Sequence, residues 1–247
     1  MNPSIRAFGA ALLAACALVS TAQANVLVGG TRVILAAKAS EVTVRLSNDS
    51  ERPALVQAWI DRGDAHSTPD TATSPFLVTP PMFRMEAKRD QNLRILYSGE
   101  PLPADRESLF WLNVLEVPPK PGADGAGSNY MQLALRSRLK FFFRPEGLAG
   151  DPLKTHQQVT FRTAAGESGV VLVVRNPTPY HVTLSEISVD VAGKAYEAAT
   201  DMVAPFAELR LPIAGLTTAP AAGAKVTFSV INDYGAATSA TAVTTTP

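Results

Sequence analysis

Cysteine is almost absent from this 247-residue sequence, whose single example, Cys16, lies in an apolar stretch near the start. Without a second thiol the chain cannot form an internal disulfide, so burial and hydrogen bonds must hold its fold. Histidine is also scarce. His66, His156 and His181 are widely spaced and form no HxH or HxxxH pair, which argues against a metal site. We expect all three at the surface.

Signatures of catalysis and of nucleic-acid binding are missing as well. No GxSxG segment occurs, the scattered acidic residues nominate no acid–base pair, and the glycines at 122, 125 and 127 lie in a Pro-rich loop. The formal charge is zero, with 22 basic and 22 acidic residues, so no overall field attracts nucleic acid or an anionic membrane. We therefore expect that the protein is not an enzyme and that it binds no metal, no cofactor and no nucleic acid.

Residues 1–24 have the organisation of a secretory signal peptide. A basic start is followed by an apolar stretch over 7–19 and by the small-x-small cleavage site Ala22-Gln23-Ala24. Cleavage there would leave a mature chain that begins at Asn25. No later run is apolar and long enough to span a bilayer, so we expect no stable membrane insertion. The alternative is lipoprotein processing at Cys16, because the LAAC segment resembles a lipoprotein cleavage box.

The rest of the sequence predicts an all-β fold. Nineteen prolines and sixteen glycines separate many short apolar runs, and no long stretch has helical periodicity. Seven runs in the first block match the strand count of an immunoglobulin-like sandwich. They are Val26–Leu35, Val42–Leu46, Leu55–Ile60, Phe83–Met85, Leu93–Tyr97, Leu109–Val117 and Met131–Phe143.

A second block of apolar runs follows a segment rich in Pro and Gly over 144–152. Its runs are Val159–Phe161, Val170–Val174, Val182–Val191, Leu209–Leu211 and Val226–Ile231. The composition of the break predicts a hinge, hence two domains, at 25–145 and 146–247. The tail over 238–247 is expected to be poorly ordered.

The segment 130–145, YMQLALRSRLKFFFRP, alternates between apolar and polar residues. The apolar positions are Met131, Leu133, Leu135, Leu139, Phe141 and Phe143, and the polar ones are Gln132, Arg136, Arg138, Lys140 and Arg144. This period of two predicts one long β-strand with an apolar face and a cationic face. Strands usually have about five or six residues, so this one exceeds the needs of its own sheet. It would offer backbone groups and an apolar row to another chain, unless it is only a long core strand.

Segments spread over nearly the whole mature chain resemble the periplasmic pilus-assembly chaperones of the PapD type. In order, they are TRVIL (31–35), SPFLVTPPMFRM (74–85), LRILYSGEPLPADRESLFWLNVLEVPPKP (93–121), LALRSRLKFFFRP (133–145), NPTPYHVTLS (176–185), MVAPF (202–206) and INDYG (231–235). The fold of that family, two immunoglobulin-like β-sandwich domains set in an L, is therefore expected here.

The resemblance also implies a function. Pilin (fimbrial) subunits of this system lack one strand, and the chaperone inserts its own long strand into the open groove before an outer-membrane usher takes the subunit over. Here the inserted segment would be Asn129–Lys140, with Met131, Leu133 and Leu135 in the pockets of the groove.

Two further sets of residues take their roles from the resemblance. Arg32 and Lys140 match the anchor for the C-terminal carboxylate of the subunit. Glu107, Arg144 and Asp233 match a salt-bridge set that joins the two domains at the hinge. The alternative function is a non-fimbrial periplasmic binding module that kept the same sandwich fold.

Overall fold

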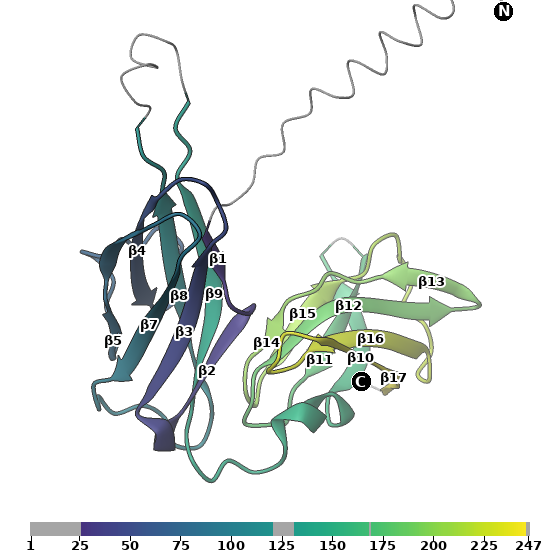
Figure 1. Ribbon diagram of the computed structural model, residues 1–247. Helices are drawn as coiled ribbons and strands as arrows, with labels where there is room; N and C mark the ends of the chain where they lie inside the picture. The colour runs from purple at the N-terminus through teal and green to yellow at the C-terminus, as the bar shows by residue number, and fades with distance from the viewer. Residues whose placement is uncertain (1–25, 121–130, 168, 246–247) are drawn as a thin grey trace, which may run out of the picture.

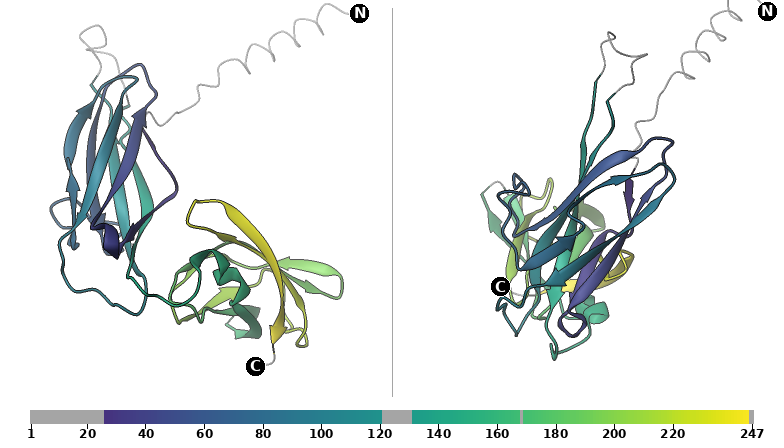
Figure 2. Two further views of the ribbon diagram at one scale, coloured as in Figure 1. Left: turned by 60° about the horizontal axis from the view of Figure 1, so that its bottom comes forward. Right: turned by 60° about the vertical axis from the view of Figure 1, so that its left-hand side comes forward.

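The protein consists of two β-sandwiches set at an angle, which gives the molecule an L shape (Figures 1 and 2). The computed structural model describes residues 26–120, 131–167 and 169–245. The expected signal peptide, Cys16 and residues 129–130 of the expected inserted segment lie outside these ranges. No helix within them is long and apolar enough to cross a membrane.

The first sandwich contains two sheets. One has the order β1 (Val26–Val28), β3 (Glu41–Asn48), β7 (Asp90–Tyr97) and β5 (Phe76–Thr79). The other has the order β2 (Arg32–Ala36), β9 (Leu135–Arg144), β8 (Ser108–Val117), β4 (Ala54–Asp61) and β6 (Met82–Met85). A short 3-10 helix, η1 (Ala37–Ala39), follows β2.

Alternate residues of both sheets fill the core between them. Phe76 of β5 packs edge-on against Phe110 of β8 and Phe141 of β9, with ring centroids 4.8 and 4.7 Å apart. Burying such a side chain contributes about 1.5–3 kcal/mol relative to leaving it exposed. Because Phe141 belongs to β9, the same strand that carries the candidate site is also fixed in the core of the domain.

The second domain is built around β17 (Ala237–Thr245). This strand pairs antiparallel with β16 (Lys225–Ile231) and parallel with β10 (Thr160–Gly166). The full strand order is β13 (Lys194–Glu197), β12 (Val182–Val191), β16, β17, β10, β11 (Gly169–Arg175) and β15 (Glu208–Pro212), with β14 (Met202–Val203) beside β12. The linker carries the 3-10 helix η3 (Pro152–Gln157).

The expectation of a poorly ordered tail over 238–247 is corrected by β17 for residues 238–245, the part of the tail that the structure describes. Its Ala, Ser and Thr residues give little hydrophobic signal, yet Ala240 and Ala242 pack against the core of the second domain. Pairing with β16 along Ala237–Val243, and with β10 at Thr244 and Thr245, orders this segment where apolar side chains alone would not.

The long strand predicted over 130–145 is shorter than expected. β9 starts at Leu135, and residues 131–134 are not in a strand. The last pair with β8 joins Glu116 to Leu135, and β8 ends at Val117. Pro118 and Pro119 follow, and proline has no N–H to continue a ladder.

The run predicted at Val26–Leu35 also differs, because it forms two strands in different sheets. Gly29 and Gly30 lie between β1 and β2, and Gly30 has a φ of 99°, a left-handed conformation that favours glycine. The chain therefore turns at this point and crosses from one sheet of the sandwich to the other.

Candidate functional site

β9 has strand neighbours on both sides along only part of its length. β8 pairs with β9 from Leu135 to Phe143, whereas β2 pairs with it only from Lys140 to Arg144. No other described strand pairs with residues 135–139. This segment is therefore an open sheet edge, whose backbone groups facing away from β8 are available to an extended chain.

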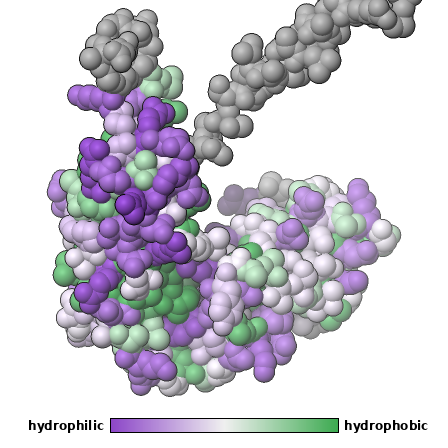
Figure 3. Space-filling view, in the orientation of Figure 1, coloured by the Kyte–Doolittle hydropathy of each residue, from purple (hydrophilic) through white to green (hydrophobic). Residues whose placement is uncertain are grey.

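The apolar row on β9 and the residues before it has two environments. Met131, Leu133 and Leu135 are 82%, 59% and 42% exposed, whereas Leu139 is 7% exposed and Phe141 fully buried. The later residues belong to the core of the first domain. The earlier ones lie at and before the start of β9, where the described chain leaves the sandwich. Figure 3 shows some apolar surface at the upper end of the first domain. The three earlier side chains have no core to pack against.

Arg32 and Lys140 lie side by side where the two domains meet. They are opposite each other in the parallel pair formed by β2 and β9. The Lys140 Nζ atom donates to Thr183 Oγ1 at 3.3 Å, and the Arg32 Nη1 atom donates to the Ile231 carbonyl oxygen at 2.9 Å. Both acceptors belong to the second domain, so the two cations span the domain boundary.

The electrostatics of this pair favour an anion. Burial lowers the pKa of Lys140, and the charge of Arg32 lowers it further, against a smaller opposing effect of Asp201. Burial also lowers the pKa of Arg32, although Asp233 and Glu107 oppose the shift. The Arg32 Nε atom is buried without a hydrogen-bond partner in the described part of the chain. A carboxylate at this position would relieve the repulsion between the two cations.

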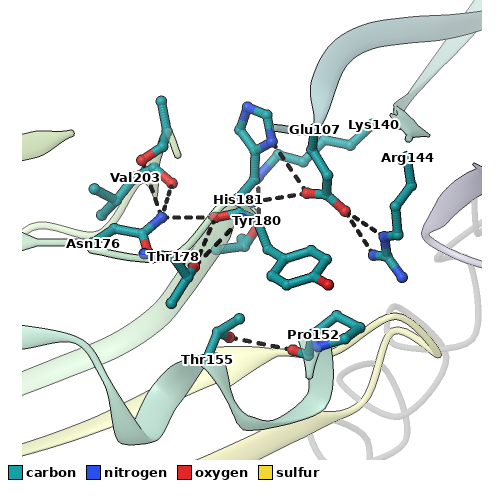
Figure 4. Close-up of polar contacts among 12 residues, drawn as sticks. Glu107, Lys140, Arg144, Pro152, Thr155, Asn176, Thr178, Tyr180, His181 and Val203 are labelled. Carbon is teal, nitrogen blue, oxygen red and sulfur yellow. Dashed lines mark hydrogen bonds and ion pairs between the residues drawn. The ribbon is translucent and has the colours of Figure 1, made fainter. Parts of the chain in front are cut away.

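Glu107, Arg144 and Asp233 meet at the hinge. Figure 4 shows the contact between Glu107 and Arg144. The Arg144 Nε atom donates to Glu107 Oε1 at 2.7 Å, and the Nη1 and Nη2 atoms donate to the two Asp233 oxygens at 2.7 and 2.9 Å. Burial alone would lower the pKa of Arg144, but the hydrogen bonds with Asp233 and the charge of Glu107 raise it. These contacts join the residue before β8 and the last residue of β9, in the first domain, to the loop after β16 of the second.

His181 corrects the expectation that every histidine lies at the surface, because its side chain is only 7% exposed. Its backbone N–H donates to Glu107 Oε2 at 2.8 Å, and its ring lies 5.3 Å from the ring of Phe142. Neither His181 nor Thr183 was a predicted site residue, because nothing in the NPTPYHVTLS segment itself places them against the first domain. The described residues contain no group of three His, Cys, Asp or Glu side chains that could hold a metal.

Protein-family models match both domains. Residues 25–149 match the model described as pili and flagellar-assembly chaperone, PapD N-terminal domain. Residues 154–242 match the model described as pili assembly chaperone PapD, C-terminal domain.

Similar proteins extend over most of the chain. The probable fimbrial chaperone YadV of Escherichia coli K12 is 43% identical over 220 residues, which cover 88% of this chain and 89% of that protein. The chaperone protein FimB/FhaD of Bordetella pertussis is 44% identical over 239 residues, which cover 95% of this chain and 93% of that protein.

Solved structures give the same result. The crystal structure of the YadV chaperone matches with a TM-score of 0.77 and 39% identity over 89% of this chain and 100% of that chain. A structure of the Salmonella enterica SafA pilin in complex with the SafB chaperone matches with a TM-score of 0.73 and 31% identity, over 91% of this chain and 98% of the matched chain.

Proposed function

The chain belongs to the PapD-like fimbrial chaperones of the chaperone–usher pathway, which are not enzymes, and we propose that it binds pilin subunits in the periplasm and delivers them to an outer-membrane usher. In this proposal residues 1–24 are a cleaved signal peptide, 25–145 form the N-terminal domain and 146–247 form the C-terminal domain. A structural relative, the SafB chaperone, forms a complex with the SafA pilin, which supports a partner of the same kind here.

The open edge of β9 is the observation that carries this proposal. A subunit that lacks one strand has an open groove, and residues 135–139 have a free row of backbone donors and acceptors to complete its sheet. The exposed side chains of Met131, Leu133 and Leu135 would enter the groove beside them. Each contributes about 1.5–3 kcal/mol when buried, before the ordering of residues 131–134 is subtracted.

Arg32 and Lys140 would bind the C-terminal carboxylate of the subunit. They lie next to the point where β2 joins β9, so a chain that pairs along the open edge of β9 can end beside them. Hydrogen bonds between a carboxylate and cationic donors are roughly twice as strong as neutral ones. The anchor therefore fixes the register in which the subunit pairs with β9.

Recovery of bound chains from the periplasm tests the function. We expect a fimbrial subunit to co-purify with the tagged wild-type protein and to be lost with Leu133→Glu, because a carboxylate buried in an apolar groove has no partner. Leu77→Glu is the matched control, since Leu77 is 63% exposed on the opposite sheet. Equal recovery of the subunit with wild type and Leu133→Glu, or no subunit with wild type in fimbriate cells, would contradict the proposal.

A further inference from the structure

The open segment of β9, residues 135–139, is fixed to the rest of the domain by the side chains on its polar face. On its apolar side Leu135 and Ser137 are exposed, and burial begins only at Leu139. A strand segment with one neighbour and little core contact tends to open locally. The side chains that fix this segment are Arg136 and Arg138, which point to the other face of the sheet.

Arg136 is bound at every nitrogen of its guanidinium group. The Nε and Nη2 atoms donate to Asn113 Oδ1 at 3.0 and 2.7 Å, and Nη1 donates to the Ala65 carbonyl oxygen at 2.9 Å. The group also lies over the ring of Trp59, 4.8 Å from its centroid. This arrangement fixes the start of β9 to β8 and to the loop after β4.

Arg138 forms an ion pair with a buried carboxylate. Its Nη2 atom donates to Asp61 Oδ1 at 2.7 Å, while its guanidinium lies 4.5 Å from the ring centroid of Trp111. The Asp61 side chain is 2% exposed. It also accepts hydrogen bonds from the Gly63 N–H, the Ser67 hydroxyl and the Asn113 amide, at 2.7, 2.8 and 2.7 Å.

Asp61 is thus the common centre of the contacts that reach β9. It accepts a hydrogen bond from Arg138 directly. It also accepts one from the Asn113 amide, whose oxygen in turn accepts a hydrogen bond from Arg136. Burial raises the pKa of Asp61, but the hydrogen bonds from Asn113, Gly63, Arg138 and Ser67 outweigh it and lower the pKa overall. Burying ions costs desolvation energy, so a network of this kind is weak evidence for added stability.

We propose that Asp61 is a positioning residue for subunit capture, which keeps residues 135–139 of β9 extended while no subunit is bound. A segment already in strand geometry loses less conformational freedom on pairing, so capture becomes faster and tighter. This inference rests on the proposed function of β9. Its first test, however, uses the free protein alone and is independent of any subunit.

Hydrogen exchange in the free protein is that test, with Asp61→Asn as the variant. Those amides of residues 135–139 that exchange slowly in the wild type should exchange at least about tenfold faster, while amides of β3 and β7 stay unchanged. Asp90→Asn is the matched control, because it removes a carboxylate paired with Arg45 in the other sheet. If Asp61→Asn does not fold, Arg138→Gln breaks the same contact from its partly exposed end.

Capture kinetics complete the test with a purified pilin subunit. Association should be about tenfold slower with Asp61→Asn and unchanged with Asp90→Asn. Unchanged exchange in β9, or equal acceleration in β9, β3 and β7, would overturn the positioning role. Failure of both Asp61→Asn and Arg138→Gln to fold would also overturn it, since the network would then serve folding. If the wild type captures no subunit, the proposed function fails while the exchange result still decides this inference.

Discussion

Arg32 and Lys140 are register partners in the parallel strands β2 and β9, so two half-buried cations lie next to each other. Neither has an ion-pair partner within the described part of the chain; Arg32 donates to a carbonyl and Lys140 to a hydroxyl. In the free protein this adjacency is unfavourable, because burial and like charge both disfavour the charged forms. The attraction of a bound carboxylate to both cations would offset these two effects, which is why we propose that the subunit terminus binds here.

Lys140→Met should therefore separate stability from function. Removing the half-buried cation should leave the free energy of unfolding unchanged or raised, since the desolvation and the repulsion with Arg32 disappear. Capture of a subunit should weaken by roughly 2–5 kcal/mol, because its carboxylate loses a charged donor. Urea unfolding and a binding titration measure the two effects. A destabilised Lys140→Met protein with normal capture would contradict this account.

The pH dependence of stability follows from the same residue. In the folded protein the pKa of Lys140 lies below 10.5, the ordinary value that applies to the unfolded chain. Between these two values the unfolded chain keeps a proton that the folded chain has lost, so stability rises with pH. We expect the unfolding free energy of wild type, measured relative to Lys140→Met, to increase as pH rises through this window. Parallel curves for the two proteins would show that Lys140 has an unshifted pKa.

The two halves of the apolar row on β9 should respond differently to truncation. Phe141→Ala should cost about 3–5 kcal/mol, because it opens a cavity beside Phe76 in the core. Leu135→Ala should change stability by no more than about 0.5 kcal/mol, as expected for an exposed residue. Tryptophan fluorescence during urea unfolding reports on the first domain, where Trp59 and Trp111 both lie. Equal destabilisation by the two substitutions would assign Leu135 to the core.

The hinge makes a separate prediction. Arg144→Ala would leave Glu107, whose side chain is 2% exposed, buried without its cation, at a cost of about 3–5 kcal/mol. The angle between the domains should also become variable, because the contact with Asp233 is lost. Small-angle X-ray scattering should show a broader distribution of distances. Arg162→Ala, which breaks a pair with Glu208 inside the second domain, should show no such change.

Alternation along the chain was sufficient to predict β9 but not its limits. Met131 and Phe141 follow the same pattern, yet one is exposed and the other is in the core. The difference depends on whether the opposite sheet extends that far, and on the prolines that end the pairing of β8. Neither effect can be predicted from the alternating segment alone.

The polar contacts were predictable only in part. Arg136 and Arg138 were recognised as a cationic face, but their partner Asp61 comes from another strand with no local signal. Similarly, Thr183 and His181 gain their contacts only when the second domain folds against the first. Five residues took their roles only from the family resemblance, because neither composition nor alternation assigns those roles: Arg32, Lys140, Glu107, Arg144 and Asp233.

The most direct test compares a pilin subunit that ends in a free carboxylate with the same subunit amidated at its C-terminus. If Arg32 and Lys140 bind that carboxylate, the wild-type protein should bind the amidated subunit more weakly by roughly 2–5 kcal/mol. The double variant Arg32→Ala/Lys140→Ala should bind both forms about equally. The two single substitutions should be non-additive, since both act on one carboxylate. Equal affinity of the wild-type protein for the amidated and the free-acid subunit would contradict the account.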